Sequence, residues 1–179
     1  MSKEFRGFIK EFFSIILISF VLAMVLRTWI IEGRIVPTGS MLPTIQLQDR
    51  LMVNKMIYRF AEPQRGDIIV FEPPDEIKAR DDFVKRLVAI PGDKVEVKNG
   101  LLYVNDEVQQ EPYVLTPMDY AFGPVVVPPD SYFVMGDNRN CSYDSHLWGA
   151  WLIRDHIIGK AFATYWPIDR LQTLKRYIS

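Results

Sequence analysis

Hydrophobic and polar positions divide the chain into two unlike parts. Residues 12–31, FFSIILISFVLAMVLRTWII, form a nearly continuous apolar run of twenty residues in which Arg27 is the single charge. A helix of that length spans about 30 Å, the thickness of the hydrocarbon core of a bilayer. After Glu32 helical periodicity almost disappears, and short runs rich in Val, Ile, Tyr and Phe alternate with Pro, Gly, Asn and Asp. The second pattern is typical of a mainly β domain.

Seven of these short runs are predicted to be strands. They are residues 51–58, 67–71, 83–90, 94–98, 101–104, 131–135 and 157–164. Asn99-Gly100, between the fourth run and the fifth, predicts a tight hairpin because both residues tolerate a positive φ. Segment 106–129 has weak patterning and is predicted to be a long connection or a lid.

The apolar run is predicted to be an uncleaved membrane anchor. Arg27 lies near one end of it, where the side chain can snorkel, and Trp29 is placed for the membrane interface. Three basic residues precede the run, and the positive-inside rule therefore puts residues 1–11 in the cytoplasm and residues 32–179 outside the plasma membrane. These basic residues are Lys3, Arg6 and Lys10.

A cleaved signal peptide and a buried core helix both fit the apolar run less well than an anchor does. A cleaved secretory signal peptide would share the basic start and the apolar stretch, but this stretch is long and no small-x-small cleavage site follows it. A buried core helix would have a polar face, and a run this uniformly apolar does not provide one.

Composition and charge mainly exclude certain partners and certain kinds of site. Lys and Arg number 21 and Asp and Glu 22, so the chain is nearly neutral, and no basic face predicts a nucleic-acid partner. Cys141 is the single cysteine, which excludes a disulfide within the chain, and one Cys with two His does not provide a zinc site. We therefore expect no metal and no organic cofactor. A chain of 179 residues is long enough for one domain with a substantial core.

A lysine lies in the middle of the predicted strand DFVKRLVAI. The two-residue period of a strand puts Phe83, Lys85 and Leu87 on one face and Arg86 on the other. Burying a charged amine costs several kcal/mol unless it is paired or loses its proton. A lysine snorkelling at a strand edge is the ordinary case. The alternative is a lysine kept neutral so that it can act as a base.

Two polar motifs lie on either side of this strand. In PTGSMLPT, Ser40 follows Gly39, which lets the backbone turn sharply and leaves the hydroxyl accessible. Only residues 32–39 separate Ser40 from the apolar run, so its hydroxyl is held close to the bilayer surface. MGDNRNCSYDSH follows the predicted strand 131–135 and is dense in turn residues. Each motif alone could equally be a solvated loop.

The motifs together resemble a known family. Behind the apolar run, PTGSMLPT, RGDIIVF, DDFVKRLVAIPGD and MGDNRNCSYDSH occur in the order found in bacterial type I signal peptidases. The resemblance covers nearly the whole chain, and the combination of motifs is far more specific than any one of them. It implies a single transmembrane helix followed by an antiparallel β-sheet catalytic domain. It also implies a serine endopeptidase whose partners are preprotein signal peptides and the lipid bilayer.

The resemblance assigns roles to four residues. Ser40 would be the nucleophile and Lys85 its general base. The hydroxyl of Thr38 and the backbone N–H of Ser40 would form the oxyanion hole; the family often has Ser at the first of these positions. Ser142 would hydrogen-bond to Lys85 and orient it.

Residue chemistry supports the Ser–Lys assignment independently. The hydroxyl of Ser40 is a poor nucleophile until a base removes its proton. An amine serves as that base near neutral pH only if its pKa falls, and an apolar wall of Phe83 and Leu87 would lower it by desolvation. A fall in the pKa of Lys85 from about 10.4 to about 7–8 lies within the range documented for buried lysines.

Further residues are implied to support the site. Arg86 and Asp137 would form a structural ion pair, and Asp144 would shape the same region. The family's last motif usually ends in Asp-Ser-Arg, whereas this chain has His146, so an Asp144–His146 pair would depend on pH. Apolar walls for small substrate side chains are expected from Met41, Val36, Ile45 and Val84.

Other chemistry remains open at this point. His146 beside Asp144 could imitate the base and orienting acid of a histidine-dependent hydrolase, although this leaves Lys85 without a role. His156 is expected to be structural, and Cys141 is a weaker nucleophile candidate. Self-cleaving repressors also use Ser–Lys chemistry, but they carry a DNA-binding domain instead of an anchor. A membrane-anchored β module that binds without catalysis is the alternative from another class.

Overall fold

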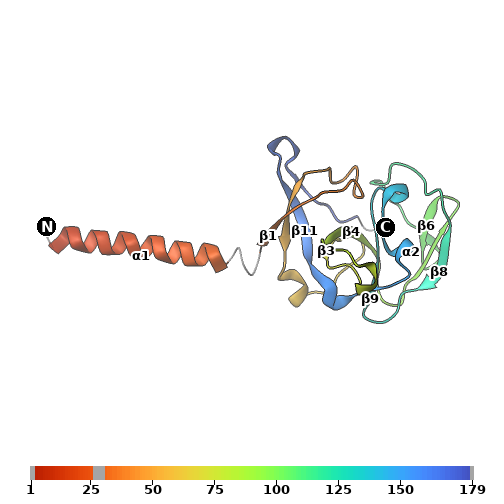
Figure 1. Ribbon diagram of the computed structural model, residues 1–179, viewed down its shortest axis with the longest axis horizontal. Coiled ribbons are helices and arrows are strands. Elements are labelled where there is room, and N and C mark those ends of the chain that lie inside the picture. The colour runs from red at the N-terminus through yellow and green to blue at the C-terminus, as the bar shows by residue number, and fades with distance from the viewer. Residues whose placement is uncertain (1–2, 26–30, 178–179) are drawn as a thin grey trace.

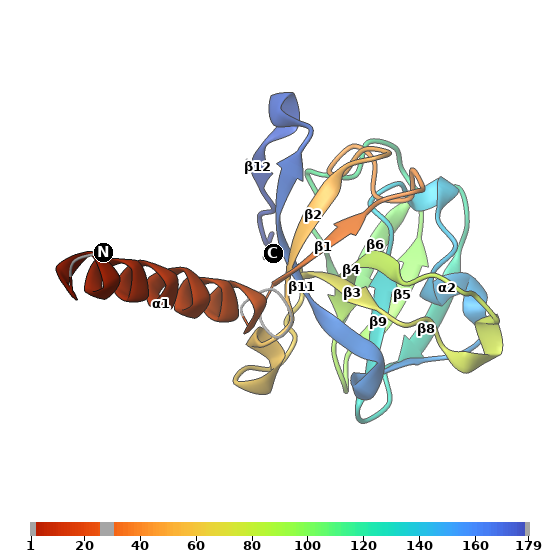
Figure 2. The ribbon, with the colours of Figure 1, turned by 60° about the vertical axis from the view of Figure 1, so that its left-hand side comes forward.

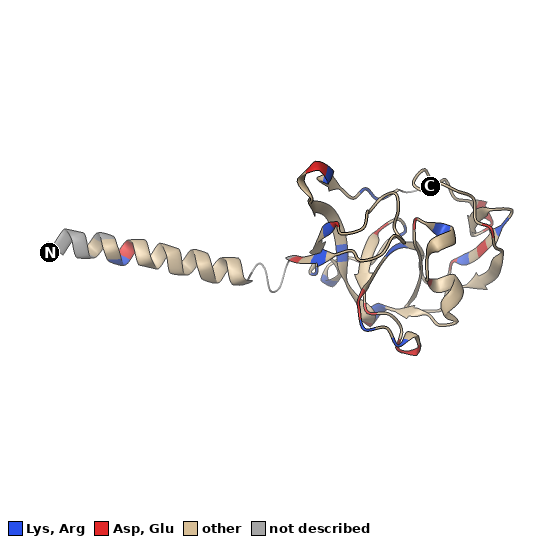
Figure 3. Ribbon diagram, turned by 45° about the horizontal axis from the view of Figure 1, so that its top comes forward, with Lys and Arg blue, Asp and Glu red and all other residues tan. Residues whose placement is uncertain are grey.

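A computed structural model describes residues 3–25 and 31–177 (Figure 1). Helix α1 (Lys3–Val25) extends away from a β-rich domain, and its side chains from residue 10 to residue 24 are exposed. From residue 12 onward this helix carries no charged side chain (Figure 3). Within the described residues, no helix meets the length and apolarity needed to cross a membrane. The predicted anchor continues past α1, and Arg27 and Trp29 lie outside the described residues.

The described part of the chain after α1 is built mainly of strands, and all of their pairings are antiparallel. The strands are β1 (Ile31–Ile35), β2 (Arg50–Asn54), β3 (Ile68–Phe71), β4 (Phe83–Ala89), β5 (Lys94–Lys98), β6 (Leu101–Val104), β7 (Glu107–Val108), β8 (Phe122–Val126), β9 (Ser131–Met135), β10 (Leu152–Ile153), β11 (Ile157–Trp166) and β12 (Gln172–Thr173). The helical turns are η2 (Ile57–Arg59), η3 (Asp75–Ile77), η4 (Arg139–Cys141), α2 (Ser145–Trp148), η5 (Arg154–His156) and η6 (Ile168–Arg170). The predicted mainly β, antiparallel fold is confirmed.

The strands form two sheets (Figure 2). The larger has the order β1-β2-β11-β3-β4-β9-β10, with β12 paired to β11, and the smaller has the order β7-β6-β5-β8. An apolar cluster joins them, because Ala89 and Phe133 of the larger sheet pack with Val95 and Leu102 of the smaller. Strand β4 pairs with β3 on one side and β9 on the other, so it lies inside the larger sheet. The central residues of β4 are therefore flanked by neighbouring strands on both sides.

All seven predicted strands occur: β5, β6 and β9 have the predicted ends, and the ends of the other four are shifted. The hairpin predicted at Asn99-Gly100 is confirmed: their φ angles are 53° and 75°, and the turn joins β5 to β6. Strands β1, β7, β8, β10 and β12 were not predicted. Two of them, β7 and β8, lie in segment 106–129, so this segment is partly sheet and not simply a long connection.

Candidate active site

Ser40 lies in a tight turn between β1 and β2. The turn, residues 38–45 and hereafter the serine turn, is closed where the backbone N–H of Ile45 donates to the carbonyl of Met41 at 2.9 Å. Asn138 holds it from the other side: its backbone N–H donates to the Ser40 carbonyl at 3.0 Å, and its side-chain amide donates to the Gly39 carbonyl at 3.1 Å. The Ser40 residue is only 8% exposed. Its position is thus set by a second loop far along the sequence.

Lys85 extends from the enclosed strand β4 toward this serine. It is 5% exposed, and its Nζ donates to Oγ of Ser40 at 2.6 Å. The Nζ atom lies 5.4 Å from the ring centroid of Phe83, which forms part of the expected apolar wall. Burial lowers the pKa of Lys85 from 10.5 to about 8, against the opposing charges of Asp144 and Asp137. The side chain is buried, so a lysine snorkelling at a strand edge is excluded.

The hydroxyl of Thr38 lies next to the same serine. Its Oγ1 is 3.3 Å from Oγ of Ser40, and either atom can be the donor. The side chain comes from the start of the serine turn and contacts the side chain of the predicted nucleophile. Its expected role as an oxyanion donor depends on a substrate and belongs to the proposal below.

Ser142 differs from expectation. Its hydroxyl is buried but has no hydrogen-bond partner among the described residues, so the predicted hydrogen bond to Lys85 is not formed. Gly136 lies beside it: a Cβ at Gly136 would come within 2.3 Å of both the Ser142 Oγ and the Ser40 carbonyl oxygen. Ser142 is therefore packed close to the site, while Lys85 uses Ser40 as its partner.

The ion pair predicted between Arg86 and Asp137 is present. Both side chains are fully buried, and the guanidinium donates from Nε at 2.8 Å and from Nη2 at 2.7 Å to the two carboxylate oxygens. Thr44 donates its hydroxyl to the same carboxylate at 2.5 Å. Burial alone would lower the pKa of Arg86, but the hydrogen bonds and charge of Asp137 outweigh it and raise the pKa. This network joins β4, the serine turn and the loop after β9.

Asp144 supports the loop beside Gly136. One carboxylate oxygen accepts from the backbone N–H of Gly136 at 2.9 Å, and the other is 2.6 Å from Nδ1 of His146. The imidazole stacks on Tyr120, with ring centroids 4.2 Å apart and planes within 3°. No hydrogen bond joins His146 to Ser40 in the described part of the chain. His156, in η5, has Nδ1 3.2 Å from the carbonyl of Glu72 and forms no hydrogen bond to Ser40 or Lys85 among the described residues.

Sequence reasoning missed the contribution of Arg139 and Glu111. Arg139 is 1% exposed, donates from Nε to the Gly136 carbonyl at 3.0 Å, and pairs with Glu111 at 2.8 and 2.6 Å. Burial would lower the pKa of Arg139, but Glu111 outweighs it and raises the pKa. The segment predicted as a connection or lid is thereby tied to the loop that supports Ser40. The motif MGDNRN contains Arg139, but nothing in the sequence indicated that Glu111 is its partner.

A cleft of about 830 Å³ opens beside Ser40 and Lys85. It is lined by residues 33–40 and 81–85, together with Val70, Asn138, Cys141 and Tyr143. Val36 and Val84 lie in this lining, as predicted for pocket walls. Met41 and Ile45 do not: both are 0% exposed and pack in an apolar cluster beneath the serine turn. The turn folds their side chains inward, which strand alternation could not anticipate.

Comparison with known proteins agrees with the motifs. Residues 9–166 match the family described as "Signal peptidase, peptidase S26". The chain belongs to this family. It is 46% identical over 157 residues to "Probable signal peptidase I-2" of Synechocystis sp., covering 86% of this chain and 72% of the relative. It is 46% identical over 162 residues to "Signal peptidase I" of Leptolyngbya laminosa, covering 88% of this chain and 79% of the relative.

A crystal structure of a signal peptidase I from Enterococcus faecalis V583 is 29% identical in sequence, with a TM-score of 0.48. The match covers 56% of this chain and 97% of the other.

Proposed function

We propose that this S26 signal peptidase is a membrane-anchored serine endopeptidase that removes signal peptides from exported preproteins. The observation that carries the proposal is the buried contact of 2.6 Å between Lys85 and Ser40. A lysine with a pKa near 8 is neutral often enough near physiological pH to accept the serine proton. The names of the relatives support the substrate class.

In the acylation step, neutral Lys85 removes the proton from Oγ of Ser40 as the oxygen attacks the scissile carbonyl carbon. The backbone N–H of Ser40 and the hydroxyl of Thr38 stabilise the oxyanion of the tetrahedral intermediate. The intermediate collapses with cleavage of the C–N bond, and the lysine ammonium returns its proton to the departing amine. The signal peptide is then held as an ester on Ser40.

In the deacylation step, neutral Lys85 takes a proton from a water molecule, whose oxygen attacks the ester carbon. The C–O bond to Ser40 breaks, and the serine oxygen recovers a proton from the lysine. The products are a signal peptide with a free carboxylate and a mature protein with a new amino terminus. No metal or organic cofactor enters these steps.

The substrate binds in extended form in the cleft. Two segments of the lining, 33–40 and 81–85, offer backbone groups to which a peptide strand can hydrogen-bond. Val36 and Val84 line the cleft that contains Ser40, and we expect them to restrict positions −1 and −3 of the signal peptide to small side chains.

The anchor is the apolar run that begins at residue 12 and ends before β1 starts at Ile31, with residues 1–11 in the cytoplasm and the catalytic domain outside the plasma membrane. The uncharged run and the three basic residues before it support this topology. The arrangement keeps Ser40 close to the surface from which signal peptides emerge.

Preprotein cleavage by purified Ser40→Ala and Lys85→Ala variants tests the proposal. We expect both to lose more than 1000-fold in kcat/KM, because nucleophile and base act as one unit. Cys141→Ser and His146→Ala serve as controls and should retain the Ser–Lys chemistry. Turnover by Lys85→Ala together with loss in His146→Ala would establish the histidine-dependent alternative. Function unaffected by Lys85→Ala would point to a non-catalytic binding module.

A further inference from the structure

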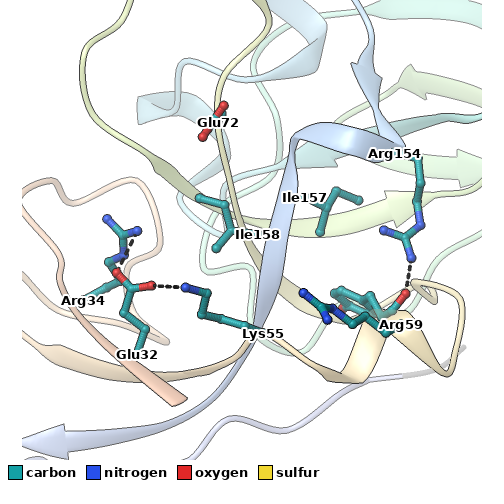
Figure 4. Close-up of a pocket in the computed structure, with 9 residues that line it drawn as sticks. Glu32, Arg34, Lys55, Arg59, Glu72, Arg154, Ile157 and Ile158 are labelled. Atoms are coloured by element: carbon teal, nitrogen blue, oxygen red, sulfur yellow. Dashed lines mark hydrogen bonds and ion pairs between the residues drawn. The ribbon is translucent and has the colours of Figure 1, made fainter. Parts of the chain in front are cut away.

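A second pocket, of about 590 Å³, lies beside β1, the first strand after the predicted anchor (Figure 4). It is formed by residues of β1, the η2 turn and the start of β11, with Ile157 and Ile158 in its wall. Arg34 lines both this pocket and the catalytic cleft, but the other charged residues of the pocket are absent from the cleft. The pocket is therefore a neighbouring and separate site, hereafter the headgroup pocket.

Cationic side chains outnumber carboxylates in the lining of the headgroup pocket, and two of these cations also pair with carboxylates outside the lining. Its lining contains four cationic side chains against two carboxylates, Glu32 and Glu72. Glu32 is shared by two of the cations, at 2.9 Å from Arg34 and 3.1 Å from Lys55. Arg34 also pairs with Asp82 at 2.7 Å, so its charge is largely neutralised within the protein.

The other two cations are less neutralised. Arg154 donates to the carbonyl of Tyr58 and is 3.4 Å from Glu62, whose side chain is 80% exposed. Arg59 is exposed, and none of the described residues forms an ion pair with it. Arg59 and Arg154 lie on the same side of the pocket in Figure 4. This side can accept an anion without breaking a strong internal ion pair.

The location of the pocket suggests which anion it meets. Arg34 follows the end of the predicted anchor by three residues, a distance of at most about 10 Å along the chain. The polar headgroup layer of a bilayer is about 5–8 Å thick on each side. Phe60, directly after Arg59, is 84% exposed, the highest value among the large hydrophobic residues of the described chain. An exposed aromatic beside cations is typical of a surface that enters the membrane interface.

We propose that the headgroup pocket binds the phosphate of an anionic membrane phospholipid. Arg59 and Arg154 contact the phosphate, and Phe60 inserts among the acyl chains next to it. The inference rests on the anchor proposed above, since the anchor brings the pocket to the bilayer. Binding would also orient the domain, because a lipid held at η2 fixes a point of contact in addition to the anchor.

The test uses the full chain in detergent micelles, offered equal amounts of phosphatidylglycerol and phosphatidylcholine, with retained lipid measured by native mass spectrometry. Arg59→Glu is the test variant, because reversing this charge breaks no internal ion pair. Lys98→Glu, on β5 of the smaller sheet, is a charge reversal away from the pocket, and it also breaks the partly exposed ion pair with Glu96. Each cation near an anionic surface contributes about fivefold in affinity, so the reversal should weaken phosphatidylglycerol retention about 25-fold. Lys98→Glu should retain the lipid like the wild type.

Three outcomes would overturn the inference. The first is equal retention of the two lipids by the wild type, and the second is unchanged retention by Arg59→Glu. The third is displacement of the lipid by an equal concentration of glycerol 3-phosphate or of an acidic peptide, which would assign the pocket to a soluble anion or to a protein segment. Preprotein cleavage by Arg59→Glu in detergent, expected at the wild-type rate, shows that the variant is folded. Failure of the wild type to cleave would refute the proposed function and leave the lipid result standing by itself.

Discussion

At the scale of single residues, the state of one amine controls the proposed chemistry. Lys85 acts as a base only when neutral, and its pKa of about 8 means that the neutral fraction falls about tenfold for each pH unit below that value. We therefore expect kcat/KM for preprotein cleavage to rise with pH and to level off above an apparent pKa near 8. An apparent pKa near 10.5 in this pH profile would contradict the inference that burial lowers the pKa of Lys85.

The neighbouring carboxylate provides a matched control for this pH profile. The charge of Asp144 raises the pKa of Lys85, so Asp144→Asn should move the limb to lower pH while keeping an acceptor for the Gly136 N–H. A variant that lowers activity without moving the limb would show that Asp144 acts only on the structure.

The buried amine of Lys85 should also lower the free energy of unfolding. Its folded pKa lies below the unfolded value, so below pH 8 both states are protonated and the folded state bears the full penalty of burying the charge. The penalty is about 3 kcal/mol, and loss of the hydrogen bond to Ser40 offsets about 1 kcal/mol of any gain. We expect Lys85→Met to raise the free energy of unfolding at pH 7 by about 2 kcal/mol. This corresponds to an increase of about 4–8 °C in Tm.

The pH dependence distinguishes this from a simple packing gain. Between pH 8 and 10.5 the unfolded state binds more protons than the folded wild type, so wild-type stability rises with pH and the advantage of Lys85→Met should shrink. Ser40→Ala loses the same hydrogen bond but keeps the amine, and it should not be stabilised. If Lys85→Met is still more stable than the wild type at pH 10.5, its gain in stability does not come from removing a buried charge.

At the scale of elements, the buried pair of Arg86 and Asp137 joins β4 to the loop after β9. Removing one partner leaves a charge uncompensated in the core, so Asp137→Ala should lower the free energy of unfolding by about 3–5 kcal/mol. Thermal unfolding of the full chain in detergent would measure this. The double variant Arg86→Met with Asp137→Ala should recover part of the loss, since no charge then stays buried. Glu96→Ala, which breaks a partly exposed pair with Lys98, should leave Tm nearly unchanged.

Elements were predictable from sequence where side chains alternate or where a turn needs positive φ. Strands β5, β6 and β9 were predicted to the residue, whereas β8 was not, because Gly123 and Pro124 interrupt its apolar pattern. Strand β1 begins at the last residue of the long apolar run, which hid its start. The two-residue strands have too few residues to form any pattern.

The candidate site was predictable to the extent that its residues lie in short motifs. Ser40 and Lys85 belong to such motifs and lie in hydrogen-bond contact. The inward direction of Met41 depends on how the serine turn folds back, which a linear pattern does not encode. Glu111 lies 28 residues from Arg139 in a weakly patterned segment, so only the tertiary structure reveals the pair.

At the scale of the whole molecule, the two sheets form one body whose active site lies close to the incoming chain. The apolar cluster between the sheets fixes β4 against β9, and the loop after β9 in turn holds the serine turn through Asn138. The headgroup pocket and the catalytic cleft share Arg34, so lipid contact and substrate binding would occur on adjoining surfaces. The height of Ser40 above the bilayer is therefore expected to matter for cleavage of membrane-embedded preproteins.

A spacer between anchor and domain tests this dependence on height. Six Gly and Ser residues inserted between residues 30 and 31 precede β1, so its pairing with β2 is kept, and they add up to about 20 Å. The scissile bond of a preprotein lies just outside an apolar segment embedded in the same bilayer, and a longer tether lowers the effective concentration of Ser40 there. We expect cleavage of a full preprotein in nanodiscs to fall at least tenfold, while a short soluble peptide with the same cleavage site is processed at the wild-type rate. Equal losses with both substrates would instead mean that the insertion damages the catalytic domain, and no loss with either would show that the anchor does not set the height of the site.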